Sequence, residues 1–573
     1  MSAPKDSIPS LTAGGAIFTR LKALGVDYVF ANSGTDFPPI IEGLAEAAAK
    51  DIALPEAVAV PHENAAMHMA YGYWLGTGRP QAVMLHTNVG LANAATATID
   101  AAMDHVPVLL MSGRTPTTEG GRFGARTVPI GWGQEMRDQV ALVREVVKWD
   151  YELRFPEQVG ELIDRAHAIA TSTPMGPVYM SLPREVLCEP CPADGLDAPP
   201  LMNAVRTAPA PDAVRHAAEI LAKAERPLII AQRGVGDARS FAAFSFFAED
   251  WGIPVCHYWA LRLAVPTGHP MCVGSDPMPW IKEADAILAI DCMAPWWPDR
   301  HQPQPDCKVI HLGPNPLFTR TPVRNFRADV ALAGETGDAM EALLAEMARL
   351  RAGRDAALAT RRADVAAKAA AIRSRTVVAA SAEPAPGAMT KPWVARCISD
   401  AIRGHRASVL SELGAPLDPM DLAEHDSWYQ EPHAGGLGWS VPVALGLQLA
   451  DRDRLVLATM GDGSYMFANP TACHQVAEAL QLPVVLVVTN NAEWKAVTNA
   501  VAGLYPQGYA AKANRMPLTD LAPSPDFTLV ARASRGWAEK VTNGADLPAA
   551  LARAIEVAKT EKRLALLDVS VVD

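Results

Sequence analysis

Two polar turns in the last third of the chain carry side chains suited to binding a metal ion and a diphosphate. The first, Gly-Asp-Gly-Ser at 461–464, follows the apolar run 454–460, and the second, Asn-Asn at 490–491, follows the apolar run 483–489. Both runs have the pattern of buried parallel strands. The turns therefore fall at the carboxyl ends of strands, where open α/β sheets bind their ligands.

The residue types in these turns predict how such ligands are held. Asp462 offers a carboxylate and Asn491 a side-chain carbonyl, which are the hard oxygen ligands that Mg²⁺ prefers. Gly461 and Gly463 let the backbone approach a ligand closely, and Ser464 adds a hydroxyl and an amide donor. We therefore expect a site for a metal ion and a phosphorylated ligand at this sheet edge.

The combination of Gly-Asp-Gly with an Asn pair about thirty residues later resembles the signature of the thiamine diphosphate enzymes. The resemblance implies thiamine diphosphate and Mg²⁺ as cofactors, with Asp462, Asn491 and Glu493 as metal ligands. Relative to the family, the stretch after Ser464 carries an apparent two-residue insertion. Asn490 therefore remains the second choice for the metal-binding Asn.

Length and composition limit the class of protein. A chain of 573 residues favours about three domains, and 49% hydrophobic residues are typical of a globular protein with a large core. The net charge of -12 argues against a nucleic-acid or anionic-membrane surface as the main partner. Residues 1–10 contain no apolar signal core and no run of membrane-spanning length occurs, so we expect a cytoplasmic protein. The eight irregularly spaced cysteines predict neither a disulfide framework nor a zinc site.

Helical and strand-like runs alternate along most of the chain, which is typical of βαβ units on parallel sheets. Two Pro-rich stretches, 188–212 and 381–392, are interpreted as linkers. We expect an α/β fold of three domains, each a mostly parallel sheet flanked by helices. The resemblance assigns a pyrimidine-binding domain, a middle domain and a diphosphate-binding domain to residues 1–190, 205–375 and 390–573.

The middle domain contains a further glycine-rich turn, RGVGDARS at 233–240, directly after a strand-like run. This turn lacks the third glycine of a dinucleotide-binding fingerprint, so we interpret it as a tight turn between a strand and a helix. FAD or ADP in the middle domain is therefore not supported by the sequence.

A second pair of motifs supplies the other half of a cofactor site. The stretch 61–80 resembles the family's His-Glu motif, with Glu63 in the first turn of a helix. The resemblance implies that Glu63 hydrogen-bonds the aminopyrimidine ring and so promotes removal of the cofactor's C2 proton. In the glycine-rich turn 435–438, it implies that Leu437 holds the cofactor bent and that the Gly435 carbonyl faces the ring. The ordinary alternatives are a helix-start glutamate and a plain glycine turn.

We expect substrate-binding residues in the first hundred residues of the chain. Leu-His-Thr at 85–87 resembles a Leu-His-Ser sequence of benzoylformate decarboxylase, and a histidine near the cofactor could move protons. The alternative is that His86 is buried and bonded to backbone. The turn FANSGTD at 30–36 resembles the decarboxylases' FGNPGS turn, and this resemblance implies that Thr35 or Asp36 lies near the substrate carboxylate. Thr35 is the better donor, because an acid there is unfavourable unless it is protonated or turned away. His433 is a further catalytic candidate.

As a whole the chain resembles the acetohydroxyacid synthase and 2-oxoacid decarboxylase branch, and most of all benzoylformate decarboxylase. We expect non-oxidative decarboxylation of a 2-oxo acid with carboligase side activity on a small 2-oxo acid or aldehyde. Three alternatives stay open: an acetolactate synthase-like carboligase with FAD, a 2-hydroxyacyl-CoA lyase, and a non-catalytic relative. The stretch 133–135 lacks the aromatic residue of the synthases' Phe-Gln-Glu motif. The likeness also implies a homodimer or homotetramer with active sites at the subunit interface.

Overall fold

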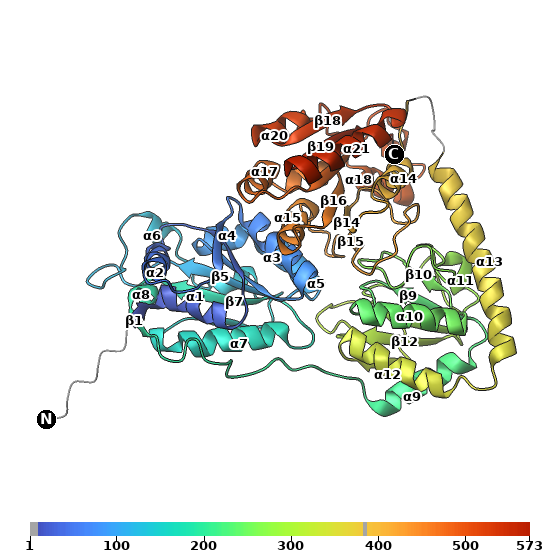
Figure 1. Ribbon diagram of the computed structural model, residues 1–573, viewed down its shortest axis with the longest axis horizontal. Helices are drawn as coiled ribbons and strands as arrows, with labels where there is room; N and C mark the ends of the chain where they lie inside the picture. The colour runs from blue at the N-terminus through green and yellow to red at the C-terminus, as the bar shows by residue number, and fades with distance from the viewer. Residues whose placement is uncertain (1–9, 382–386, 573) are drawn as a thin grey trace. The chain divides into compact units, whose positions relative to one another are not determined.

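The computed structural model describes residues 10–381 and 387–572 and contains three sheets in which every strand pairing is parallel (Figure 1). This arrangement confirms the predicted fold class. Residues 1–9, on which the expected absence of a signal sequence depends, and part of the second predicted linker, 382–386, lie outside the described residues. By internal packing the chain divides into two compact units, one of 1–205 with 432–452 and the other of 206–431 with 453–573.

The N-terminal sheet has the strand order β3-β2-β4-β5-β7-β6. In Figure 1, α1 and α7 cover one face of this sheet, while α3 and α5 lie on the other. Coverage on both faces explains why β4 is buried at every position. The strands are β2 (Tyr28–Asn32), β3 (Glu56–Ala59), β4 (Gln81–Leu85), β5 (Val108–Arg114), β6 (Asp150–Glu152) and β7 (Val178–Pro183). The helices are α1 (Ala13–Ala23), α2 (Pro38–Ala49), α3 (Glu63–Thr77), α4 (Thr87–Asn93), α5 (Ala95–Met103), α6 (Ile130–Gly133), α7 (Val159–Thr171) and α8 (Arg184–Cys188).

The first predicted linker contains a short strand. β8 (Pro190–Pro192) pairs antiparallel with β1 (Ser10–Thr12). Within β8, Cys191 is buried and its thiol donates to the Pro156 carbonyl at 3.2 Å. The chain up to residue 205 packs with the N-terminal unit.

The second unit contains the other two sheets. The middle sheet has the order β10-β9-β11-β12-β13, with strands β9 (Pro227–Ala231), β10 (Val255–Cys256), β11 (Ala286–Ile290), β12 (Lys308–Gly313) and β13 (Val330–Ala333). Its helices are α9 (Pro211–Lys223), α10 (Ala238–Trp251), α11 (Met278–Ile281), α12 (Thr336–Arg349) and α13 (Asp355–Ala380). The last two of these helices are separated by a turn in which Gly353 has a φ of 78°.

The C-terminal sheet has the order β15-β14-β16-β17-β19-β18. β16 and β17 form at the two predicted apolar runs, and α21 packs against α14, β18 and β19. The strands are β14 (Ala407–Glu412), β15 (Trp428–Gln430), β16 (Leu455–Gly461), β17 (Val485–Asn490), β18 (Trp537–Val541) and β19 (Ala565–Ser570). The helices are α14 (Lys391–Ala401), α16 (Asp462–Phe467), α17 (Pro470–Ala479), α18 (Lys495–Leu504), α19 (Tyr509–Lys512), α20 (Phe527–Ala533) and α21 (Leu547–Glu556).

One helix from late in the chain belongs to the N-terminal unit. α15 (Ser440–Ala450) packs along α3 so closely that the two backbones touch. A Cβ added at Gly72 would lie 2.0 Å from the Val443 carbonyl oxygen, and one added at Gly446 would lie 2.1 Å from the Met69 carbonyl oxygen. Because α3 begins at Glu63 and α15 follows the 435–438 turn, this contact fixes both motifs relative to each other.

We expect Gly72→Ala to lower the free energy of unfolding by about 1–3 kcal/mol, because the added methyl group overpacks the α3–α15 contact. The measurement is the denaturant or thermal unfolding midpoint. Gly160→Ala in α7 is the matched control, since its added Cβ would meet only a Leu196 methyl group at 3.8 Å. Equal midpoints for the two variants would contradict the close approach.

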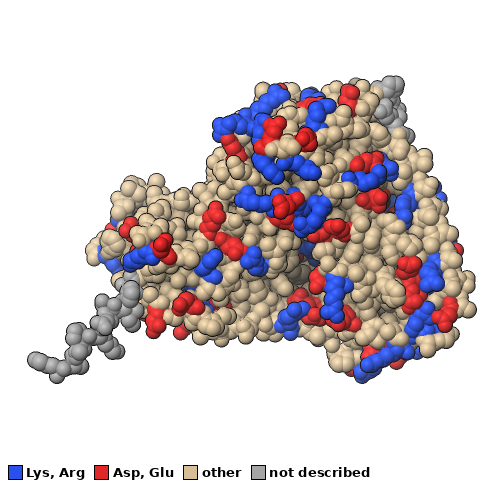
Figure 2. Space-filling view, viewed as in Figure 1, with Lys and Arg blue, Asp and Glu red and all other residues tan. Residues whose placement is uncertain are grey.

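No helix within residues 10–381 and 387–572 combines the length with the apolar character that a membrane crossing requires. On the face drawn in Figure 2, basic and acidic side chains are interspersed rather than gathered into a stripe of one sign.

Candidate active site

Glu63 is held in a narrow slot at the start of α3. The residue is 9% exposed, and its Oε2 accepts a hydrogen bond from Asn93 Nδ2 at 3.1 Å. Gly90 lines the slot, because a Cβ there would lie 3.3 Å from Glu63 Oε1. His62 caps the helix by accepting from the Asn64 amide at 3.3 Å. The carboxylate is thus oriented and nearly dry, which fits a group that must meet one nitrogen of an aminopyrimidine ring.

His86 lies at the carboxyl end of β4, where it occupies the N-cap position of α4. Its Nδ1 lies 2.5 Å from Asp36 Oδ1, and its Nε2 lies 3.1 Å from Gln134 Nε2. The hydrogen bond to Asp36 is the main cause that raises the pKa of His86; burial opposes it, and the charges of Asp36 and Glu63 add to the rise. The His86 ring therefore bonds to the Asp36 and Gln134 side chains, and not to backbone groups as the alternative interpretation expected.

Thr35 and Asp36 point to different environments. Thr35 is exposed, and its carbonyl accepts from Arg184 Nη1 at 3.1 Å. Asp36 is 3% exposed and is turned into the domain, where its Oδ2 accepts from the Thr87 amide at 3.4 Å. The Asp36 carboxylate is thus turned away from solvent, which is one of the two conditions under which an acid is expected near a carboxylate substrate. The role of Thr35 as a hydrogen-bond donor stays a prediction.

The turn 435–438 needs glycine at two positions, because Gly435 has a φ of 67° and Gly438 a φ of 93°. Between them, the Gly436 amide donates to Asp100 Oδ1 at 3.2 Å, and Asp100 Oδ2 lies 3.1 Å from His68 Nε2. His68 is on α3, so this buried pair connects the helix of Glu63 to the turn. The proposed bending of the cofactor by Leu437 stays a prediction.

His433 lies just before this turn, between the buried Pro432 and the exposed Ala434. It is half-buried, and its catalytic role stays a prediction.

Asp462 is the first residue of α16, at the carboxyl end of β16. It is 3% exposed, and its Oδ1 accepts from the Gly463 amide at 2.9 Å while its Oδ2 accepts from the Ala492 amide at 2.8 Å. Burial is the main cause that raises the pKa of Asp462, and these two amides oppose the rise. A buried carboxylate of this kind is suited to a divalent cation, which would favour its charged form.

The two asparagines after β17 differ in what they bind. Asn490 donates to Asp568 Oδ1 at 3.0 Å and accepts from Ser524 Oγ at 3.1 Å, so its amide is used within the fold. Asn491 is half-buried in the following turn, and its Oδ1 accepts from the Glu493 amide at 3.1 Å. Both side chains thus have partners within the fold, and the choice of Asn491 over Asn490 as the metal ligand stays a prediction.

The Glu493 side chain is directed toward α18, since it accepts from Thr498 Oγ1 and lies 3.8 Å from Lys495 Nζ. Within the described ranges, no group of three or more His, Cys, Asp and Glu residues could hold a metal ion. A site built on Asp462 and an amide oxygen, completed by phosphate oxygens, fits this donor set. Metal binding by Glu493 stays a prediction, and its carboxylate already contacts Thr498 and Lys495.

Trp494 lies against the backbone of the Gly-Asp-Gly turn. A Cβ added at Gly463 would be 2.1 Å from Trp494 Cζ3, so only glycine fits there. The indole also meets Phe467 edge to face at 5.9 Å, and the Trp494 amide donates to the Thr519 carbonyl at 2.7 Å. Ser464, the third residue of α16, is also buried. This packing holds the turn 461–464 in place.

Family models match three successive parts of the chain. Residues 11–142 match the thiamine pyrophosphate enzyme, N-terminal TPP binding domain; residues 214–343 match the central domain; and residues 417–569 match the C-terminal TPP binding domain. The matched residues include Glu63, His86, Asp462 and Asn491.

The chain is also similar to individual proteins over nearly its whole length. It is 28% identical to a probable 2-ketoarginine decarboxylase of Pseudomonas aeruginosa, covering 92% of this chain and 89% of the relative. It is 24% identical to a probable acetolactate synthase large subunit of Methanocaldococcus jannaschii, covering 94% and 89%. Among solved structures, the thiamine diphosphate-dependent 4-hydroxybenzoylformate decarboxylase of Rhodococcus jostii RHA1 has the same fold, with a TM-score of 0.76, 22% identity and 98% of each chain covered.

Proposed function

The chain belongs to the thiamine pyrophosphate enzymes, and its relatives include decarboxylases and acetolactate synthases, so we propose that it is a Mg²⁺-dependent decarboxylase of 2-oxo acids. The observation that carries the proposal is the pairing of His86 with Asp36, close enough to Glu63 for its charge to act on the imidazole. A decarboxylase must return a proton to the carbon that loses CO₂, and an imidazole beside a carboxylate can supply it.

Bound thiamine diphosphate would supply a nucleophilic carbon for addition to the keto carbon and a cationic ring to accept electrons as CO₂ leaves. The chain's own residues then have separate tasks. Glu63 holds a proton at its carboxylate for the aminopyrimidine ring, and Asn93 keeps that carboxylate in one orientation. Asp462 and Asn491 hold the cation, while His86 moves a proton at Nε2.

The substrate class we favour is an aryl 2-oxo acid, the class named for the Rhodococcus decarboxylase, and a guanidino 2-oxo acid is the alternative from the Pseudomonas relative's name. The test is a panel of benzoylformate, 2-ketoarginine and pyruvate with purified protein, thiamine diphosphate and Mg²⁺, in which both CO₂ and the organic product are identified. Aldehyde in equal amount to CO₂ supports the proposal. Acetolactate or another hydroxyketone as the main product makes the enzyme a synthase, and no turnover on any acid overturns both.

The acetolactate synthase alternative would gain support from FAD in the middle domain, but the residues there do not fit a dinucleotide. β9 and β11 flank the point where strand order reverses, and Arg233 bridges their carboxyl ends by donating to the Asp291 carbonyl at 3.0 Å and to its Oδ1 at 3.2 Å. An ion pair thus fills the crevice in which such sheets bind nucleotides.

A cavity of about 620 Å³ beside the 233–240 turn fits a dinucleotide no better. Its two arginines are already paired, Arg206 with Asp338 at 2.8 Å and Arg239 with Glu341 at 3.5 Å. A diphosphate there would therefore meet acidic as well as basic side chains. We expect the purified protein to show no flavin absorption band in the visible spectrum, and a yellow protein that releases FAD on denaturation would contradict this.

We also propose carboligase side activity and a homodimer or homotetramer with active sites at the subunit interface. Both follow from family likeness. Light scattering of the purified protein measures the oligomer, and adding an aldehyde to the decarboxylation assay measures the side activity.

A further inference from the structure

Three side chains from separate segments form a line through the His86 ring. Asp36 follows β2, His86 follows β4, and Gln134 follows α6. The contacts run from Asp36 Oδ1 to His86 Nδ1 at 2.5 Å and from His86 Nε2 to Gln134 Nε2 at 3.1 Å. Both ring nitrogens thus have side-chain partners, and we call these residues the Asp36–His86–Gln134 relay.

The surrounding backbone is shaped to admit this relay. A Cβ at Gly34 would lie 2.2 Å from the His86 ring, and a Cβ at Gly113 would lie 1.5 Å from Asp36 Oδ2. Thr87, directly after the histidine, has a φ of 40°, which is rare for a β-branched residue. Two glycines and a strained threonine therefore surround one histidine–carboxylate pair, and such strain is commonly stored at functional sites.

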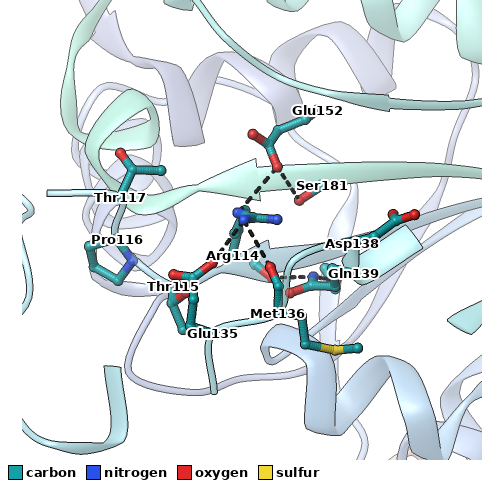
Figure 3. Close-up of polar contacts among 12 residues, drawn as sticks. Arg114, Thr115, Pro116, Thr117, Glu135, Met136, Asp138, Gln139, Glu152 and Ser181 are labelled. Atoms are coloured by element: carbon teal, nitrogen blue, oxygen red, sulfur yellow. Dashed lines mark hydrogen bonds and ion pairs between the residues drawn. The ribbon is translucent and has the colours of Figure 1, made fainter. Parts of the chain in front are cut away.

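Gln134 is fixed through its neighbour Glu135. Figure 3 shows Arg114 at the end of β5 between Glu135 and Glu152. Glu135 accepts from Arg114 Nη2 at 2.8 Å and from Thr115 Oγ1 at 2.8 Å, and it also pairs with Arg126. These contacts tie the loop before Gln134 to the sheet edge, so the amide is held at His86 rather than left to move with the loop.

The titratable groups that face His86 are both acids. Asp36 comes from the segment after β2 and Glu63 from α3, and both favour the charged imidazolium, while burial opposes it. Asp36 is itself nearly dry, at 3% exposed, so its charge is little screened. The hydrogen bond to Asp36 and the two negative charges therefore act in the same direction.

We propose that Asp36 is a positioning residue that keeps His86 in its protonated form, with Nδ1–H bound and Nε2–H available to the reacting carbon. This inference rests on the proposed decarboxylase function. In the step, the Nε2–H bond breaks as a C–H bond forms at the carbon that lost CO₂; the electron pair of the broken bond stays on Nε2, and water restores the proton.

Gln134 holds Nε2 in both proton states. In the structure the Gln134 NH₂ faces Nε2 at 3.1 Å, which suits a neutral Nε2 that accepts from it. Rotation of the amide turns its oxygen toward the ring, where it accepts from a protonated Nε2 until the proton is transferred. Rapid protonation of the carbon releases aldehyde before a second carbonyl compound can react. Asp36 therefore sets the partition between decarboxylation and carboligation.

The first test is histidine hydrogen–deuterium exchange read by mass spectrometry, which gives the protonation midpoint of His86 from its own peptide without any turnover. In the wild-type holoenzyme we expect a midpoint above the ordinary value of about 6.5. In Asp36→Asn we expect it to fall by about one to three pH units, because the opposing charge is lost. Asp27→Asn, which removes a carboxylate bonded to Tyr73 in the same domain, should leave the midpoint unchanged.

The second test is the pH profile of kcat/KM with the best 2-oxo acid. Because activity requires protonated His86, its alkaline limb should move to lower pH in Asp36→Asn, and the ratio of hydroxyketone to aldehyde should rise several-fold. A wild-type midpoint at or below the ordinary value overturns the inference even if Asp36→Asn fails to fold. A raised midpoint in a protein that decarboxylates no 2-oxo acid leaves the relay standing and overturns the proposed function instead.

Discussion

Glu63→Gln is expected to lower kcat by about 10²–10⁴-fold while the protein folds normally. The substituted amide has the same shape and can still bond Asn93, but it cannot hold the carboxyl proton that the aminopyrimidine ring requires. Steady-state kinetics at saturating cofactor measure the loss. Exchange of the cofactor's C2 proton for deuterium, followed by proton NMR, should slow by a similar factor, and that readout needs no substrate.

Glu56→Gln is the matched control, because Glu56 is an exposed acid on β3 of the same sheet. It should leave both rates unchanged, and both variants should keep the wild-type unfolding midpoint. Full turnover in Glu63→Gln would remove Glu63 from cofactor activation. Slow C2 exchange with an altered unfolding midpoint would instead indicate a distorted α3.

The sequence indicates candidate residues in local motifs more readily than hydrogen-bond pairs between distant segments. Glu63 and Asp462 are candidates from the sequence because each is part of a local motif whose spacing has a chemical meaning. Asp36 and His86 are 50 residues apart, and only the pairing of β2 with β4 brings the segments after them together. A predicted order for these strands would have been the signal, but alternating runs indicate parallel strands without giving their order.

The same limit applies to α15. Its sequence, SVPVALGLQLA, is apolar on all sides and predicts a buried helix. Periodicity does not say what buries it, and residues 432–452 pack with the N-terminal unit although they lie in the last third of the chain. Gly72 and Gly446 were the available signal for a close helix–helix contact, since each lacks a side chain at the point where α3 and α15 approach most closely.

The position of the candidate metal-binding Asn depends on the local alignment of the chain with the family motif. The insertion after Ser464 left two asparagines as candidates, and these have different partners in the fold. Asn490 ends β17 and faces Asp568 of the neighbouring strand β19, a contact that depends on the sheet order.

Asp462→Ala is expected to abolish Mg²⁺-dependent retention of thiamine diphosphate. Loss of residues that only support a metal ligand costs about 10–100-fold in metal affinity, so loss of the carboxylate itself should cost at least that much. The buried carboxylate is held by two backbone amides at 2.8–2.9 Å, and no methyl group can replace its charge. Calorimetric titration of the protein with thiamine diphosphate, with and without Mg²⁺, measures the effect.

Asp453→Ala is the control for this loss, because Asp453 is an exposed acid just before β16, at the opposite end of the strand from Asp462. It should bind cofactor like the wild type and with the same gain from Mg²⁺. In Asp462→Ala the titrations with and without Mg²⁺ should coincide, which separates loss of the metal site from general unfolding that would abolish all binding. Tight, Mg²⁺-dependent binding in that variant would move the metal away from the 461–464 turn and leave Asp462 as a residue that only closes the turn onto the Ala492 amide.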